Sequence, residues 1–206
     1  MNKPFLILLF VTLLFSACSK KNNVSPTPSN QVNIGGTSYP TTTIGNQIWT
    51  TVNYSGAGGY SVTKSNEYGT FFTQAQALKI ILPAGWRVPT IADYNKLLGN
   101  YTSTKDNDGY YTISGDGAAG ALVSSSLTFG TNLSGFDALY AGYCTTTSGQ
   151  FNDNTEYTQA YFLTADSLDE ISYKIYGVMI TSGSASITGY SNPGSLALSV
   201  RFVRDK

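Results

Sequence analysis

The stretch 82–98 constrains the fold more than any other part of the chain, because it combines a turn, a tryptophan, a proline and a helix start. Pro89 keeps the residue before it extended, so a helix cannot begin earlier. Thr90 is placed to cap a helix, with Asp93 in its first turn. Apolar side chains then recur at helical spacing: Ile91, Tyr94, Leu97, Leu98 and Tyr101. We therefore predict a helix after Thr90, with Trp86 as a core residue between this helix and a sheet.

The N-terminus has the features of a secretory signal: Lys3, an apolar run over residues 5–15, and small residues before Cys18. The run is shorter than the roughly 20 residues that a membrane-spanning helix needs. The residues Leu-Phe-Ser-Ala before Cys18 resemble a bacterial lipobox. This resemblance implies cleavage after residue 17, acylation of Cys18 and anchoring in the envelope of a double-membrane bacterium, in its outer membrane. The alternative is a secreted protein with an incidental cysteine.

Composition divides the chain into a signal peptide (1–17), an acylated cysteine with a flexible stalk (18–31), and one domain (32–206). The stalk is rich in Lys, Asn, Ser and Pro and has almost nothing to bury. The domain is long enough for a substantial core. The whole chain has a formal net charge of zero. A protein that binds nucleic acid is usually basic, so we expect no nucleic-acid partner.

The chain contains no histidine. This excludes Ser-His-Asp and Cys-His catalysis and zinc sites built on histidine. If Cys18 is acylated, Cys144 is left alone, so no internal disulfide supports the fold. A lone cysteine of this kind is expected to be a small buried apolar residue.

The rest of the chain is rich in strand patterns. Residues 39–44 and 47–54 flank Gly45-Asn46, which predicts a hairpin with a two-residue turn. Thr73 and Gln76 form a capping-box pattern that predicts a first helix over 73–82.

After Tyr101 no further helix is predicted, and residues 102–160 are interpreted as loops and short strands. Strands are predicted at 161–164, 173–181 and 196–204. In the last of these, Ala197, Ser199 and Arg201 alternate with apolar residues. Two helices in the first half, followed by many strands, indicate an α+β fold with a mainly antiparallel sheet and a long loop-rich region.

Several segments, in this order, resemble the Fibrobacter succinogenes major paralogous domain, a family of secreted bacterial domains that is common in lipoproteins. The segments that carry the resemblance are 44–49, 83–90, 132–143, 149–151, 161–164 and 199–205. They span about residues 34–205, nearly the whole mature domain.

The resemblance implies a C-type-lectin-like fold, with the first and last strands side by side and long loops at one end. It implies no established biochemical role. The family often has cysteines where this chain has Leu82 and Phe202, and often has His where it has Arg87 and Trp where it has Tyr94. This chain therefore lacks both cysteines of a disulfide that the family resemblance implies.

Two motifs suggest small ligands. Residues 115–120 match G-x-G-x-x-G, with Asp137 at the position of a ribose-binding acid. No helical pattern follows this motif, so we interpret it as a plain glycine-rich loop and expect no nucleotide cofactor. Asp106 and Asp108, and Asp153 with Glu156, are weak candidates for a calcium site, since hard cations prefer clustered oxygens. Polar turns are the alternative interpretation.

Aromatic and polar residues gather in the loop-rich half. The candidate ligand-binding residues are Tyr110, Tyr111, Tyr143, Asn152, Asp153 and Tyr157. Tyrosine on loops suits glycan or protein recognition, and packing on a sheet is the alternative.

These observations favour a non-catalytic, lipid-tethered binding module for a glycan or a surface protein. The second hypothesis is a structural component of the envelope without a soluble ligand. The third is a glycan-active enzyme that uses the carboxylates named above, which requires two of them to face each other across a cleft.

Overall fold

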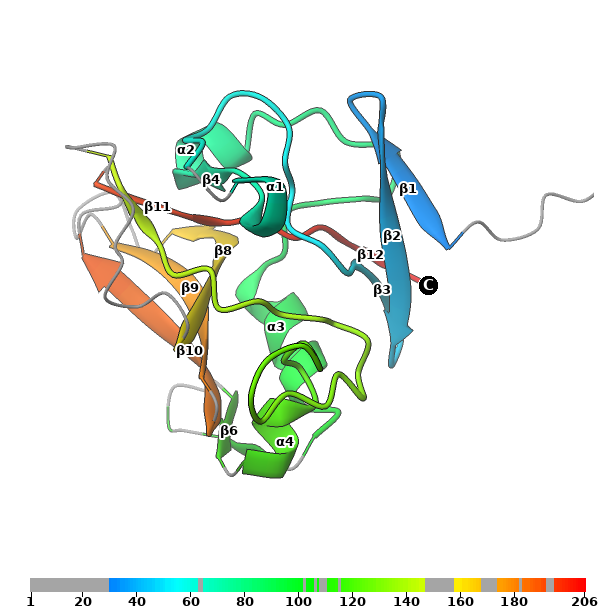
Figure 1. The fold of residues 1–206 in the computed structure, drawn as a ribbon, viewed down its shortest axis with the longest axis vertical. Helices are drawn as coiled ribbons and strands as arrows, with labels where there is room; N and C mark the ends of the chain where they lie inside the picture. The colour runs from blue at the N-terminus through cyan, green and yellow to red at the C-terminus, as the bar shows by residue number, and fades with distance from the viewer. Residues whose placement is uncertain are drawn as a thin grey trace, which may run out of the picture.

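The computed structural model describes residues 30–62, 65–101, 103–105, 107, 111–114, 116–146, 158–167, 174–181, 183–191 and 195–206. In these residues the chain forms two sheets with four short helices (Figure 1). Cys18, the signal and most of the stalk lie outside the described residues. Their cleavage and acylation therefore stay predictions.

The smaller sheet joins the two ends of the domain. Its order is β1 (Gln31–Ile34), β2 (Thr37–Ile44), β3 (Gln47–Thr50) and β12 (Val203–Asp205). The predicted hairpin is confirmed, because Ile44 pairs with Gln47 across the Gly45-Asn46 turn. Its second strand ends at Thr50, earlier than predicted. The last strand pairs antiparallel with β3, so the first and last strands belong to one sheet.

The larger sheet has the order β4 (Phe71–Phe72), β11 (Leu196–Ser199), β8 (Gln159–Ser167), β9 (Lys174–Thr181), β10 (Ser184–Ser191), β6 (Tyr111–Ser114) and β5 (Ser103–Lys105). A short strand, β7 (Cys144–Thr145), also pairs with β11. The pairings are antiparallel except between β11 and β8. The α+β class with mainly antiparallel sheets is confirmed.

The helices are short. They are α1 (Ser65–Tyr68), α2 (Gln74–Ala77), α3 (Ile91–Leu98) and α4 (Asp116–Gly120). The predicted capping box of Thr73 with Gln76 is present, and the predicted Thr90 cap is also found, where Asp93 completes a second capping box.

Three predictions about the elements are wrong. The first helix ends at Ala77 rather than at Leu82, because Leu78 caps it and a turn follows at residues 78–79. A helix, α4, forms after Tyr101 in the glycine-rich stretch, where Ala119 packs into the core. The predicted strand 196–204 divides into β11 and β12. The chain passes from the larger sheet to the smaller one between these two strands.

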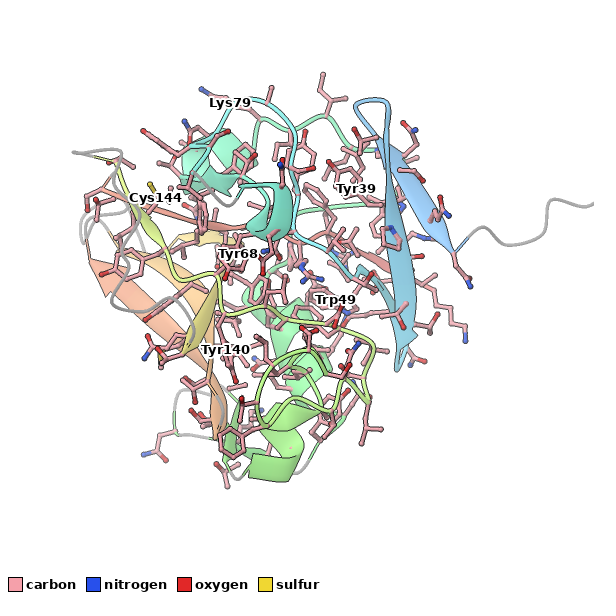
Figure 2. The ribbon with its side chains drawn as sticks, in the orientation of Figure 1. Tyr39, Trp49, Tyr68, Lys79, Tyr140 and Cys144 are labelled. Atoms are coloured by element: carbon pink, nitrogen blue, oxygen red, sulfur yellow. The ribbon has the colours of Figure 1, made fainter. Side chains whose placement is uncertain are left out.

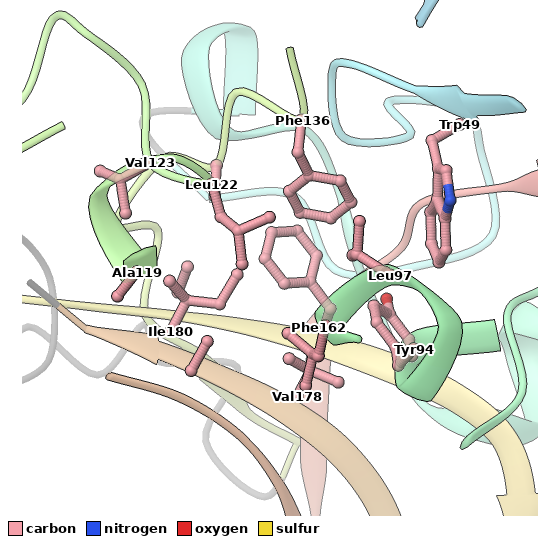
Figure 3. Packing of buried hydrophobic residues seen from close by; sticks show 14 of the residues in the cluster. Trp49, Tyr94, Leu97, Ala119, Leu122, Val123, Phe136, Phe162, Val178 and Ile180 are labelled. Atoms are coloured by element: carbon pink, nitrogen blue, oxygen red, sulfur yellow. The ribbon is translucent and has the colours of Figure 1, made fainter. Parts of the chain in front are cut away.

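The main core lies between α3, α4 and the sheets. Trp49, Phe136 and Phe162 are each fully buried there, with Trp49 and Phe136 edge to face at 5.6 Å and Phe136 and Phe162 at 5.3 Å (Figure 3). Trp49 is thus the core tryptophan. Trp86, which was predicted for this place, is only partly buried and packs against a second cluster.

The second cluster also explains the missing cysteines of the family pattern. Leu82 and Phe202 both pack in it, Phe202 fully buried. Apolar contact therefore occupies the region where the family resemblance implies a disulfide. Cys144 is a free, buried cysteine in a third cluster, as expected (Figure 2), and burial raises the pKa of its thiol.

Arg201 lies where the chain passes between the sheets, and its side chain is 1 % exposed. Its Nε donates to Asn53 Oδ1 (2.7 Å), and its Nη1 donates to the carbonyls of Thr50 (3.0 Å) and Phe136 (2.9 Å). Its Nη2 donates to the carbonyl of Asp137 (3.0 Å). One guanidinium therefore joins three distant segments of the chain.

The charge of Arg201 has aromatic neighbours rather than a carboxylate partner among these contacts. The guanidinium lies 5.0 Å from the ring centre of Phe136 and 5.4 Å from that of Phe162. Burial lowers the pKa of Arg201 to about 9, which leaves it charged at neutral pH.

Arg201→Lys is expected to lower the free energy of unfolding by about 3 kcal/mol, because an ammonium cannot reach the separated acceptors and leaves buried carbonyls without donors. Urea unfolding followed by tryptophan fluorescence measures this loss. The control is Lys206→Gln at the exposed C-terminal residue, with an expected change within about 0.5 kcal/mol. A loss below about 1 kcal/mol for Arg201→Lys would contradict this role.

Candidate functional site

A polar groove of about 680 Å³ lies between the β2–β3 turn, α3 and β12. Its polar lining consists of Asn46, Gln47, Asn95, Lys96, Asn100 and Asp205. Four of these side chains are amides, and the other two have opposite charge. The volume falls within the usual range of ligand pockets.

The groove depends on Gly45 in the turn. Its φ is +58°, and a Cβ there would lie 2.7 Å from Asn100 Oδ1. The Asn100 side chain in turn donates from Nδ2 to the carbonyls of Lys96 (2.6 Å) and Leu97 (3.2 Å), at the end of α3. Glycine thus allows the turn and the end of the helix to meet.

Asp93 supports the groove from below and is 2 % exposed. Its carboxylate accepts from Arg87 Nε (3.0 Å) and Nη2 (2.6 Å), and from Thr90 N (3.0 Å) and Oγ1 (2.9 Å). Gln47 Nε2 adds a further bond of 2.8 Å. Burial alone raises the pKa of Asp93, but the hydrogen bonds from Arg87 and Thr90 outweigh it, and the net pKa is lowered.

The ion pair between Arg87 and Asp93 is part of a charged network that reaches the rim of the groove. Arg87 Nη2 lies 3.1 Å from Asp205 Oδ2, and Lys96 Nζ lies 3.6 Å from Asp205 Oδ1. The hydrogen bond with Asp93 is the main reason why the pKa of Arg87 is raised, against the effect of burial. Asp205 and Lys96 are 60 % and 58 % exposed, so both remain accessible to a ligand.

Gln47 is the most informative residue of the lining, because it is 1 % exposed. Its Nε2 donates to Asp93, and this bond fixes the amide orientation, since a flipped amide would place oxygen against carboxylate. Its Oε1 is then buried and has no hydrogen-bond donor in the described part of the chain. A buried acceptor without a donor is costly, and a donor group on a ligand would satisfy it.

The predicted ligand-binding tyrosines are described only in part. Tyr143 is half-buried, packs against the second cluster and meets Tyr161 edge to face at 5.4 Å. Tyr111 belongs to β6. Tyr110, Asn152, Asp153 and Tyr157 lie outside the described residues. Packing therefore explains why Tyr143 is half-buried. The predicted ligand-binding site in the loops stays a prediction.

The calcium candidates Asp106, Asp108, Asp153 and Glu156 also lie outside the described residues. Within the residues that are described, no group of three His, Cys, Asp or Glu side chains converges on a metal position. No described helix is long and apolar enough to cross a membrane.

Sequence reasoning did not find the groove. Asn46 was interpreted only as a turn residue and Asp93 only as an acidic residue in the first turn of the helix, and both roles are correct. The missed signal was that the segments 44–49, 83–90 and 199–205, which carried the family resemblance, come together around one place.

The comparison with protein families identifies the family of the chain. Residues 42–204 match the Fibrobacter succinogenes major domain (Fib_succ_major). The chain therefore belongs to this family. Neither the curated proteins nor the solved structures yielded a match.

Asp93 is expected to govern stability in acid. Its pKa is lower in the folded state than in the unfolded state, so it stabilises the fold above the unfolded value of about 3.9, and this contribution is lost as the pH falls further. Asp93→Asn should cost about 2 kcal/mol at neutral pH, less than for a fully buried pair because Arg87 is 33 % exposed.

The measurement is urea unfolding between about pH 2 and 6, where Asp93→Asn should flatten the dependence of stability on pH. Asp205→Asn is the matched control, and its exposed carboxylate should change stability by less than about 1 kcal/mol. An unchanged acid slope in Asp93→Asn would show that another group is responsible.

Proposed function

We propose that the protein is a lipid-anchored protein of the bacterial envelope, attached through Cys18 to the outer membrane, and that its domain is a non-catalytic binding module with a C-type-lectin-like fold. The ligand is a glycan or a surface protein. The fold supports this proposal because the first and last strands belong to one sheet, as the family resemblance implies.

The groove between the β2–β3 turn and α3 carries the proposal. Amide and charged side chains offer both donors and acceptors, and a sugar hydroxyl acts as both. Gln47 Oε1 is an oriented acceptor without a donor in the described chain. These properties suit a hydroxyl-bearing ligand held by hydrogen bonds.

The carboxylates near the groove favour binding over catalysis. Asp93 already accepts five hydrogen bonds and has a lowered pKa, whereas a general acid needs a raised one. Asp205 lies between two cations, Arg87 and Lys96. The groove thus lacks a free pair of facing carboxylates among the residues described.

The test is a binding screen of the full chain in detergent against panels of glycans and envelope proteins. For the best ligand, Lys96→Gln should weaken binding about tenfold, through loss of a charged donor at the rim. Lys79→Gln, an equally simple change at an exposed lysine outside the groove, should leave the Kd unchanged (Figure 2).

Flat isotherms across both panels would count against a binding module. Together with purification in a stable envelope assembly, they would favour the structural alternative. Turnover of a polysaccharide that stops when Asp106, Asp108, Asp153 or Glu156 is changed would favour the enzyme.

A further inference from the structure

A second feature lies outside the groove: the loop of residues 124–137 exposes two large apolar side chains. Phe129 is 65 % exposed and Leu133 is 83 % exposed. The backbone of the loop is nevertheless held firmly, because the amides of Thr131, Asn132 and Ser134 donate to carbonyls of residues 120–123 at 2.9–3.0 Å. The two side chains are therefore presented on a fixed loop.

The loop also stores backbone strain. Phe129, Asn132 and Asp137 have φ values of +69°, +49° and +58°, which non-glycine residues rarely adopt. Asn132 Oδ1 accepts from the Asp137 amide at 3.0 Å, and Arg201 holds the Asp137 carbonyl from below. Such strain persists where the surroundings fix it, often at functional positions.

Asp137, whose carbonyl Arg201 holds, is the one charged residue of the loop. Residues 117–136 include no Asp, Glu, Lys or Arg. Transfer of an exposed apolar pair flanked by Ser, Thr, Gly and Asn into a lipid interface requires little free energy. Transfer of charged residues requires much more.

The loop and the first described residue of the stalk approach neighbouring residues of β2. The Thr41 amide donates to the Asn30 carbonyl at 2.7 Å. On the adjacent residue, Thr42 Oγ1 lies 2.7 Å from where a Cβ on Gly135 would be. A flexible chain as long as the segment from Cys18 to Asn30 spans on the order of 20 Å, so a lipid at Cys18 keeps this edge near the bilayer.

A groove with two basic side chains lies on the other face of the same strand, because Arg204 pairs with Ile48 while Thr42 pairs with Trp49. Thr41 to Thr43 line it together with Asn30, Trp86, Arg204 and Lys206. The Arg204 guanidinium lies 5.7 Å from the ring centre of Trp86, and its Nε is buried with no partner in the described chain. Tryptophan and basic side chains are the groups that contact lipid headgroups.

We propose that this edge of the domain docks on the lipid bilayer that holds the anchor. Phe129 and Leu133 enter the interface, and Arg204 and Lys206 face lipid phosphates. We define the docking edge as loop 124–137 with Thr41 to Thr43, Arg204 and Lys206. The inference rests on the lipid anchor of the proposed function and is independent of the ligand in the polar groove.

The test uses the full acylated protein, reconstituted into vesicles of phosphatidylethanolamine and phosphatidylglycerol. An environment-sensitive fluorophore is attached at Leu133→Cys, and at Ile81→Cys as the matched control. Ile81 is 90 % exposed and follows α2, which lies at the opposite end of the long axis from α4 (Figure 1). Nitroxide-labelled lipids should quench the Leu133 probe at least about twofold more than the Ile81 probe.

Three results would overturn the proposal: equal quenching of the two probes, stronger quenching at Ile81, or no quenching at either site in protein that floats with the vesicles. Intact mass and flotation separate this failure from failure of the anchor. A chain that is neither acylated nor floating overturns both the anchor and the docking edge. Loss of glycan binding with retained quenching at Leu133 would overturn only the ligand proposal.

Discussion

The arrangement of the two sheets depends on the burial of one charge. Arg201 is fully buried, yet its hydrogen bonds go to backbone carbonyls and one amide oxygen, and its faces lie near two aromatic rings. Burying an unpaired charge is very costly unless every donor is used. The acceptors come from the segment after β3 and from the loop that ends at Asp137, so the guanidinium determines how these segments meet the last part of the chain.

A second buried polar centre links the small sheet to α3. Asp93 is at once the helix cap, the partner of Arg87 and the acceptor for Gln47 from the hairpin. Its five hydrogen bonds fix the base of the groove, and Lys96 and Asp205 remain exposed at the rim. The polar groove is thus positioned by structural hydrogen bonds, and the end of loop 124–137 is held by Arg201 through the Asp137 carbonyl.

Local chemistry made part of this fold predictable. The Gly45-Asn46 turn, the Thr73–Gln76 capping box and the Thr90 cap involve residues at most three apart, and each formed as expected. Longer-range features were missed. The alternation along 196–204 predicted one continuous strand, but residues 197–203 are all buried because the segment crosses between the two sheets. The groove was missed for the same reason, since Gln47 and Asp93 are far apart in the chain.

The most direct measurement of the central claim is nitrogen-15 NMR of the arginine side chains in the full chain at neutral pH. If Arg201 holds the segments together, its Nε–H and Nη1–H protons will give resolved signals that exchange slowly with water, because they donate to buried oxygen acceptors. Averaged, rapidly exchanging signals for Arg201, like those of exposed arginines, would contradict the account.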